Sequence, residues 1–523
     1  MAVPMTTSSP QGPRRETSTG LRIAMICAMM GTFMQVLDST IANVALPYMQ
    51  GGLQASRDQI TWVLTSYIVA AAIMTAPVGW IATRLGRKNY FLISLSGFTL
   101  LSALAGAATS LDQLILFRIL QGMFGASLSP LSQSVMLDRY PPEKRGMIMS
   151  IWGMVVMIGP ILGPVLGGFL TDNYSWRWVF YVNVPVGILA ISGMAIFLSD
   201  DNPASEQSFD WSGFAYFAVA IGALQFFLDR GTTKDWFSSS EIVVEAVLAG
   251  MGFYLFLIHF LTAKKTFIPH GLFRDRNYVS ALMLTAVIGV LMLATSALMP
   301  PYLENLGGYS VLDVGMMLAP RGLGTMITML IVGQLVLRID VRIPMAIGAV
   351  LLTWSFWEMS SWTPDISATT LSLTVFVQGL AMGMIFIPAN IMAFATLPGH
   401  LRTDASAMIN LARNVGSGIG ISVTQSVLTM NSQVVHATLA VHASPFNRML
   451  GVNAQSLVLN PKLPIGAIML NGIITRSALI TSYSDTFYMM MFMSVPAFVV
   501  LMLIPKPDPT LPKAGEPALE LIE

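Results

Sequence analysis

An acidic residue, Asp38, lies inside an apolar segment that is long enough to cross a membrane. It is the only charged side chain between Arg22 and Arg57. A carboxylate inside the hydrocarbon layer is costly, so such a residue generally has a function. Counting about nine residues back from Pro47 at ~1.5 Å per residue, Asp38 lies about 13 Å inside that end of the helix. At that depth a proton, a cation or a substrate can reach it from only one side at a time.

Three arginines, Arg118, Arg321 and Arg413, also fall within long apolar segments. Arg118 lies about six residues and Arg321 about nine from the predicted outer ends of their segments, so both reach a depth similar to that of Asp38. Either could therefore pair with this carboxylate. If helix movement changed that neighbour, Asp38 would bind and release protons in turn. The alternative is a static buried pair that fixes helix packing.

Glycine and proline alternate in the segment GMVVMIGPILGPVLGGFL. The pattern consists of Gly159, Pro160, Gly163, Pro164, Gly167 and Gly168. Proline removes a backbone hydrogen bond and bends a helix, and glycines four residues apart let another helix approach closely. We therefore predict a kinked, tightly packed helix, which serves either as simple packing or as a seal against uncoupled leakage.

A very short turn, GWIATRLGRK, joins two apolar segments. It contains Gly79, Arg84, Gly86, Arg87 and Lys88. Basic residues in short loops set the orientation of a membrane protein, and this role alone could explain the charges. The other interpretation is a cytoplasmic gate, whose arginines contact neighbouring helix ends and separate when the site opens inward.

Amide side chains in apolar segments have reason to avoid lipid. Those of Gln35, Asn43, Gln378, Asn390 and Asn410 are therefore candidates for the wall of a substrate cavity. Each could instead bond to an adjacent helix.

The composition predicts an all-α polytopic membrane protein. Of 523 residues, 54% are hydrophobic and 11% are charged, against about 25% charged in an average soluble domain. Fourteen stretches approach the roughly 20 mostly apolar residues of a membrane span, and all are too long and uniform for β-barrel strands. They lie near 23–46, 60–82, 90–110, 113–136, 147–170, 178–198, 212–228, 242–262, 278–302, 312–336, 343–361, 368–396, 404–429 and 486–504.

The sequence matches itself at nearly constant offsets, which indicates a duplication. Gly79, Arg84 and Lys88 correspond to Gly333, Arg338 and Arg342, while Gln121, Gly122, Arg145, Gly159 and Gly163 correspond to Gln378, Gly379, Arg402, Gly416 and Gly420. Two six-helix bundles, 21–200 and 271–505, are predicted to flank a linker, 201–270, with two extra transmembrane helices. Asp38 has no acidic counterpart in the second bundle, and Arg118 corresponds to Val375. Both are therefore candidates for coupling rather than scaffolding.

Lys and Arg concentrate in alternate loops, which predicts that both termini face the cytoplasm. The tails, 1–20 and 506–523, would then be cytoplasmic, and a long loop near 430–485 would be periplasmic. The sequence contains no phosphate-binding GxxxxGK[ST] loop, HExxH motif or CxxC pair. We therefore expect no metal or cofactor, no nucleic acid partner, and a proton gradient rather than ATP as the energy source.

The segments LDSTIANVALP, GWIATRLGRK, FRILQG and GMVVMIGPILGPVLGG together resemble the major facilitator superfamily. More narrowly, they resemble its fourteen-helix drug:proton antiporters of the EmrB/QacA type, and the stretch LDRGTTKDWFSSSEI resembles EmrB-like pumps of bacterial inner membranes. The resemblance extends over nearly the whole chain. It implies alternating access by two bundles and export of hydrophobic small molecules driven by inward proton flow.

By the same resemblance, Asp38 matches the acidic residue of the first-helix motif, and Arg118 matches the arginine of the fourth-helix motif that is linked to proton transfer. Gly159, Pro160, Gly163 and Pro164 match the antiporter motif. Thr83 departs from the pattern, because the cytoplasmic turn usually has an acidic residue there. Pumps of the EmrB type work with a periplasmic membrane-fusion adaptor and an outer-membrane channel, for which segment 430–485 would be a docking element. Two other functions remain open: export of one dedicated siderophore or lipid, and a membrane scaffold without transport.

Overall fold

A computed structural model of the chain describes residues 18–199, 208–336, 339–443 and 463–504, and every regular element in these ranges is a helix. Most of the predicted N-terminal tail, the C-terminal tail and the centre of the predicted 430–485 loop lie outside the described residues. So does Arg338, one of the residues matched in the duplication.

The first bundle contains ten helical segments. They are α1 (Ser18–Gly52), α2 (Arg57–Ile60), α3 (Trp62–Thr75), α4 (Val78–Leu85), α5 (Arg87–Ala107), α6 (Leu111–Gly125), α7 (Leu128–Arg139), α8 (Pro142–Asn173), α9 (Trp178–Tyr181) and α10 (Asn183–Phe197). Short polar residues begin several of the helices by accepting a backbone N–H bond from the first turn. Ser110 does so for α6. α8 continues unbroken through Pro160 and Pro164, whereas the chain bends by 61° between α3 and α4, next to Pro77.

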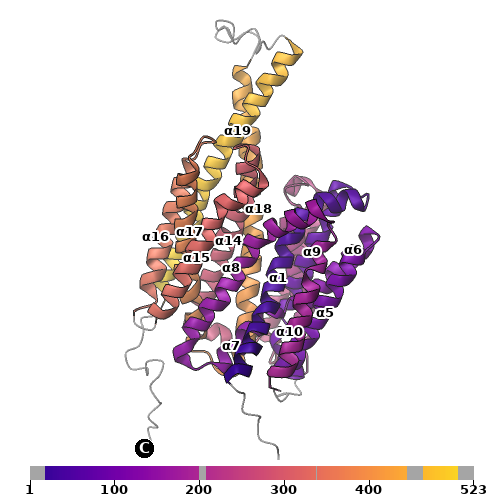
Figure 1. Ribbon diagram of the computed structural model, residues 1–523, viewed down its shortest axis with the longest axis vertical. Coiled ribbons are helices and arrows are strands. Elements are labelled where there is room, and N and C mark those ends of the chain that lie inside the picture. The colour runs from indigo at the N-terminus through magenta and orange to yellow at the C-terminus, as the bar shows by residue number, and fades with distance from the viewer. Residues whose placement is uncertain (1–17, 200–207, 337–338, 444–462, 505–523) are drawn as a thin grey trace, which may run out of the picture.

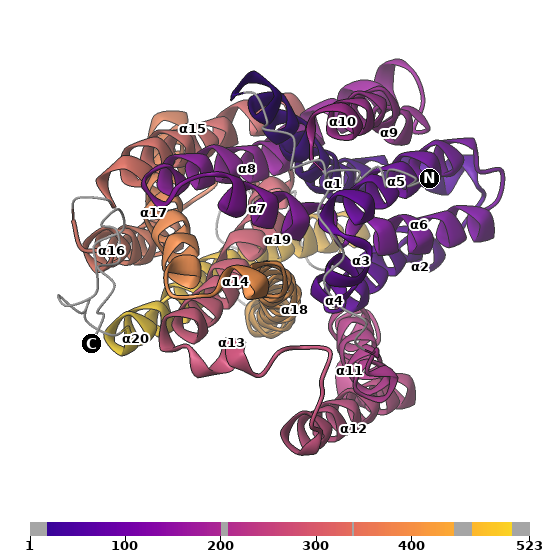
Figure 2. The same cartoon turned by 90° about the horizontal axis from the view of Figure 1, so that it is seen from below.

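A helical pair and its linkers follow the first bundle. The elements are α11 (Trp211–Arg230), η1 (Trp236–Ser238), α12 (Ser240–Thr262) and α13 (Gly271–Arg274). α11 packs against α12 and α3, so the pair lies at the periphery when the molecule is viewed along its long axis (Figure 2).

The second bundle begins at Arg276. Its elements are α14 (Arg276–Asn305), α15 (Val311–Leu335), α16 (Arg342–Ser360), α17 (Ala368–Ala395), η2 (Gly399–Leu401), α18 (Arg402–His442), α19 (Pro464–Met493) and α20 (Val495–Leu503). The two bundles meet where α8 packs against α15 and α7 packs against α18. α1 begins and α20 ends at the same end of the molecule, which we call the terminal end (Figure 1).

The prediction of fourteen spans is wrong when the described helices are judged by length and apolarity. Eleven of them are long and apolar enough to cross a membrane, and the bent pair α3 and α4 adds a twelfth. The segments 343–361 and 404–429 do form helices, α16 and α18, but fall short of this criterion. α16 contains Glu358 next to Trp357. α18 is rich in Ser, Thr and Asn, because much of its length is buried against other helices rather than exposed to lipid.

The segment 430–485, predicted to be a loop, is helical in nearly all of the residues that the structure describes there. α18 continues to His442 and α19 begins at Pro464. Neither Gly nor Pro occurs between Gly420 and Pro445, so nothing in the sequence ends the helix where its apolar run ends. The two helices pack side by side and project beyond the rest of the molecule, opposite the terminal end (Figure 1).

Candidate functional site

Asp38 and Arg118 form an ion pair in the interior of the first bundle. The Arg118 Nη1 atom lies 2.5 Å from Asp38 Oδ2, and both side chains are 0% exposed. α1 supplies the carboxylate and α6 supplies the guanidinium. A buried pair keeps its charges only if other groups satisfy the remaining polar atoms, so the surrounding residues decide what the pair can do.

The second carboxylate oxygen of Asp38 accepts two further hydrogen bonds. Gln121 Nε2 and Asn183 Nδ2 each lie 3.0 Å from Oδ1. Asn183 also donates to Ser102 Oγ at 3.1 Å, and Ser102 in turn donates to the carbonyl oxygen of Phe180. Asp38 of α1 is therefore held by groups from α6 and α10, and Ser102 of α5 in turn holds Asn183, so a shift of any of these helices changes its surroundings.

Arg118 has contacts that do not depend on Asp38. Its Nε donates to the Val63 carbonyl oxygen at 3.1 Å, its Nη1 donates to Gln121 Oε1 at 2.9 Å, and its guanidinium carbon lies 4.0 Å from the centre of the Tyr67 ring. The guanidinium can thus stay in place when Asp38 loses its charge. Arg118 Nη2 and the Tyr67 hydroxyl have no hydrogen-bond partner in the described structure. Both groups can therefore form new hydrogen bonds when the surroundings of Asp38 change.

The glycines of α8 pack directly against the part of α1 that carries Asp38. A Cβ atom added at Gly159 would contact Val36, one at Gly163 would overlap Thr40, and one at Gly167 would lie 3.0 Å from the Ile41 carbonyl oxygen. These three glycines thus follow α1 for two turns around Asp38. Gly168 faces open space instead.

This difference gives a matched pair of substitutions. Gly163→Ala should lower the thermal unfolding midpoint of the purified protein and impair transport, because the new methyl group forces α8 away from Thr40 and Ile41. Gly168→Ala should leave both unchanged or raise the midpoint, since Ala favours a helix over Gly by about 1 kcal/mol. Equal midpoints and transport rates for the two variants would contradict the proposed role of this contact.

The other two intramembrane arginines are not brought to Asp38. Arg321 of α15 donates to Ser296 Oγ at 3.1 Å and to the Met292 carbonyl oxygen at 3.2 Å, both on α14. Arg413 donates to Asn410, one turn earlier on α18. Neither forms an ion pair with any described carboxylate. Of the three arginines considered from the sequence, the structure pairs only Arg118 with Asp38.

A row of polar contacts joins the two bundles between the Asp38 site and the terminal end. One side of α7 provides Ser129, Gln133, Ser134 and Asp138, which contact Asn410, Asn390, Thr403 and Arg402 of the second bundle in that order. The first three contacts have lengths of 3.0, 2.8 and 2.7 Å. Opening of the bundles at this end would have to break all four.

The predicted gate residues lie at the end of this row. Arg87 forms an ion pair with Asp138, which therefore binds one arginine from each bundle. Arg84 lies over the Trp80 ring, and Lys88 is in the first turn of α5.

Of the two predicted gate glycines, Gly79 contacts the Asp404 side chain. Gly86 has φ +82°, a conformation that favours glycine, and it makes the sharp turn from α4 to α5.

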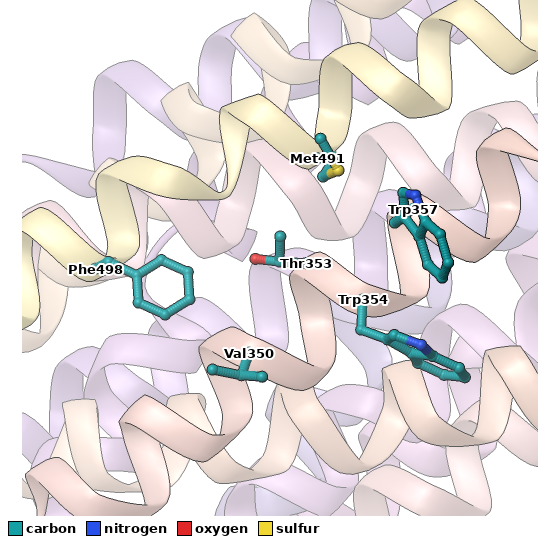
Figure 3. A pocket seen from close by; sticks show the side chains of 6 residues that line it. All are labelled: Val350, Thr353, Trp354, Trp357, Met491 and Phe498. Atoms are coloured by element: carbon teal, nitrogen blue, oxygen red, sulfur yellow. The ribbon is translucent and has the colours of Figure 1, made fainter.

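The five predicted cavity amides have different surroundings. Gln378, Asn390 and Asn410 are buried, Gln35 is half-buried and Asn43 is exposed. Asn390 and Asn410 belong to the contacts between the bundles. An apolar pocket of about 380 Å³ lies elsewhere, between α16 and the α19 and α20 pair, and contains none of these amides (Figure 3). Its lining consists of Val350, Thr353, Trp354, Trp357, Met491 and Phe498.

Sequence reasoning did not assign Gln121, Asn183, Ser102 or Tyr67 to the site. Gln121 follows Arg118 by three residues and thus shares its helix face, which could have identified it. The other three are common residue types in membrane helices, and nothing in their spacing relates them to Asp38.

Comparison with known proteins places the chain in a family. Residues 28–421 match the Major Facilitator Superfamily. The chain is 36% identical over 429 residues to the multidrug export protein EmrB of Haemophilus influenzae, covering 82% of this chain and 84% of that protein. It is 34% identical over 487 residues to the multidrug export protein EmrB of Escherichia coli, covering 92% of this chain and 94% of that protein.

The fold is also found in a solved structure. The crystal structure of the human organic anion transporter MFSD10 has a TM-score of 0.56 and 14% sequence identity, and the alignment covers 91% of this chain and 99% of that one. At this identity the likeness concerns the fold alone. The chain therefore belongs to the Major Facilitator Superfamily, as a secondary transporter of the EmrB type and not an enzyme.

Proposed function

We propose that this protein is a proton-driven multidrug exporter, which moves hydrophobic toxic compounds out of the cytoplasm by alternating access. The observation that carries the proposal is the fully buried pair of Asp38 and Arg118, in a chain related to multidrug export proteins. Its membrane would be the bacterial inner membrane, with the terminal end in the cytoplasm.

The surroundings of Asp38 support a role in proton exchange. The carboxylate is held by one guanidinium and two amides, and Arg118 keeps three other contacts when that carboxylate becomes neutral. Protonation of Asp38 therefore changes the local charge without requiring Arg118 to move. The α8 glycines transmit such a change, because α1 and α8 contact each other along the whole segment and α8 also packs against the second bundle.

The test is drug-dependent proton movement by the purified protein. In proteoliposomes with an imposed pH gradient, hydrophobic cationic, neutral and anionic drugs should each be tested for exchange against protons. Exchange with several unrelated drugs supports the multidrug function. Exchange with a single siderophore or lipid would support a dedicated exporter instead, and the absence of any flux would overturn the proposal.

We further propose that the projecting helices contact a periplasmic adaptor, which joins this protein to an outer-membrane channel. α18 contains 41 residues, so at 1.5 Å per residue it is about 60 Å long, about twice the hydrocarbon thickness. The projecting part carries exposed apolar side chains, with Val441 74% exposed and Ile465 and Ile468 each 72% exposed. Apolar groups in water at this distance from lipid favour a protein partner.

A triple substitution tests this contact. Val441→Glu, Ile465→Glu and Ile468→Glu together should prevent co-purification of the adaptor and remove resistance in whole cells, because charges replace the apolar surface. Drug-dependent proton exchange in proteoliposomes should persist, since the Asp38 site is untouched. Gln433→Glu, on α18 with Val441, adds a charge at an exposed polar position and is the control. Normal adaptor binding by the triple variant would exclude this surface.

A further inference from the structure

A second buried carboxylate lies at the terminal end, where three parts of the chain meet. Asp404, in the first turn of α18, is 8% exposed. A Cβ atom added at Gly79 of α4 would overlap its carboxylate, so this group is pressed against the backbone of the first bundle. It lines a small pocket of about 90 Å³ together with Trp80, Thr83, Arg84, Thr266, Phe267 and Pro269. The pocket is thus formed by α4, by the linker after α12, and by α18.

Within the described residues, no other residue donates a hydrogen bond to Asp404 or forms an ion pair with it. The donors nearby are committed elsewhere. On the first bundle, the Thr83 hydroxyl donates to the Gly79 carbonyl oxygen at 2.9 Å, Arg84 lies over Trp80, and Arg87 binds Asp138.

The donors on the other elements are also engaged. Arg402, on the same helix as Asp404, binds Asp138. The Tyr278 hydroxyl of α14 donates to the Ala405 carbonyl oxygen at 3.1 Å. His270 of the linker contacts the Phe260 carbonyl oxygen at 2.6 Å. The backbone N–H of Asp404 itself and the charge of Arg87 favour the ionised carboxylate, but burial outweighs both. This closed arrangement therefore favours Asp404 with a proton bound.

We propose that Asp404 is a second proton-binding site, which takes up a proton as the cytoplasmic gate closes and releases it as the gate opens. Separation of the bundles would withdraw Asp404 from Gly79 and admit water. Hydration favours the ionised carboxylate. The inference rests on the proposed alternating-access function and adds a regulated step to it.

The position of Thr83 agrees with this assignment. Thr83 of the first bundle and Asp404 of the second bundle line one pocket. The gate thus contains one carboxylate from each bundle, Asp138 of α7 and Asp404 of α18. In this proposal Asp404 contacts the first bundle only while the gate is closed, so its proton affinity depends on the state of the gate.

The test measures gate closure directly. Spin labels are placed on exposed positions of the two bundles by Leu85→Cys and His400→Cys, with Cys27→Ser to remove the native thiol and Asp38→Asn to remove titration of the first site. Distances between the labels are measured in nanodiscs over a range of pH. The ratio of closed to open molecules should rise as pH falls, by up to about tenfold per pH unit, the limit for one proton.

Adding Asp404→Asn, which mimics the protonated acid, should keep the gate closed and remove this pH dependence. Asp365→Asn, at an exposed acid between α16 and α17, should leave the dependence intact. An unchanged pH dependence with Asp404→Asn overturns the proposal, and so does an open gate in that variant. The measurement needs no drug, so failure here is distinguishable from failure of drug and proton exchange, which is measured with an intact Asp38.

Discussion

Asp38→Asn should abolish proton-driven drug export while leaving the protein folded in the membrane. Asn is nearly isosteric with Asp, and its side-chain oxygen can still accept the hydrogen bond from Arg118. It has no proton to release, so the coupled step is lost. The expected result is the absence of drug-dependent proton movement in everted membrane vesicles, with expression close to that of the wild type.

The control for this variant is Asp112→Asn. Asp112 lies in the first turn of α6, the helix that carries Arg118, but it is exposed. Its substitution should leave coupling unchanged. Drug-dependent proton movement by Asp38→Asn at the wild-type rate would refute the assignment of Asp38 as the coupling residue.

Arg118→Gln should both uncouple and destabilise the protein. Removing one partner of a buried ion pair leaves an uncompensated charge and typically costs about 3–5 kcal/mol. The variant also loses the bond to the Val63 carbonyl oxygen and the contact with the Tyr67 ring. The expected result is a lower thermal unfolding midpoint, together with loss of drug-dependent proton movement.

The double variant Asp38→Asn with Arg118→Gln separates the two effects. Since it removes both charges, it should recover much of the stability lost in Arg118→Gln, although transport stays absent. A double variant no more stable than Arg118→Gln alone would mean that Arg118 acts mainly through its contacts with Val63 and Tyr67. Retained coupling in either variant would show that the pair is only a packing element.

The helices were largely predictable from the sequence, but their ends and number were not. Apolar runs locate the helices because lipid selects for them. The apolar pattern is weak in α18, because its polar residues face other helices. It also ends before the helix does, since the hydrogen bonds of α18 continue beyond its apolar part to His442. The bend beside Pro77, by contrast, has a direct cause in the sequence.

Only the charged residues of the site were predictable from the sequence. Asp38 and Arg118 are conspicuous in apolar segments, and their pairing agrees with the estimated depths. Arg321 has a similar estimated depth, yet it contacts α14. Depth follows from counting residues, whereas the direction in which a side chain points depends on how the helices pack. The same limit conceals Asn183, whose role depends entirely on where α10 lies.

Every group that holds Asp38 comes from the first bundle, and this has a consequence for how such a protein can change. In the described part of the second bundle, Arg321 and Arg413 have no carboxylate partner, and no residue contacts Asp38. Under the proposed function, substitutions in the second bundle leave every described contact of Asp38 unchanged. The compounds exported can then diversify without any change to the coupling site.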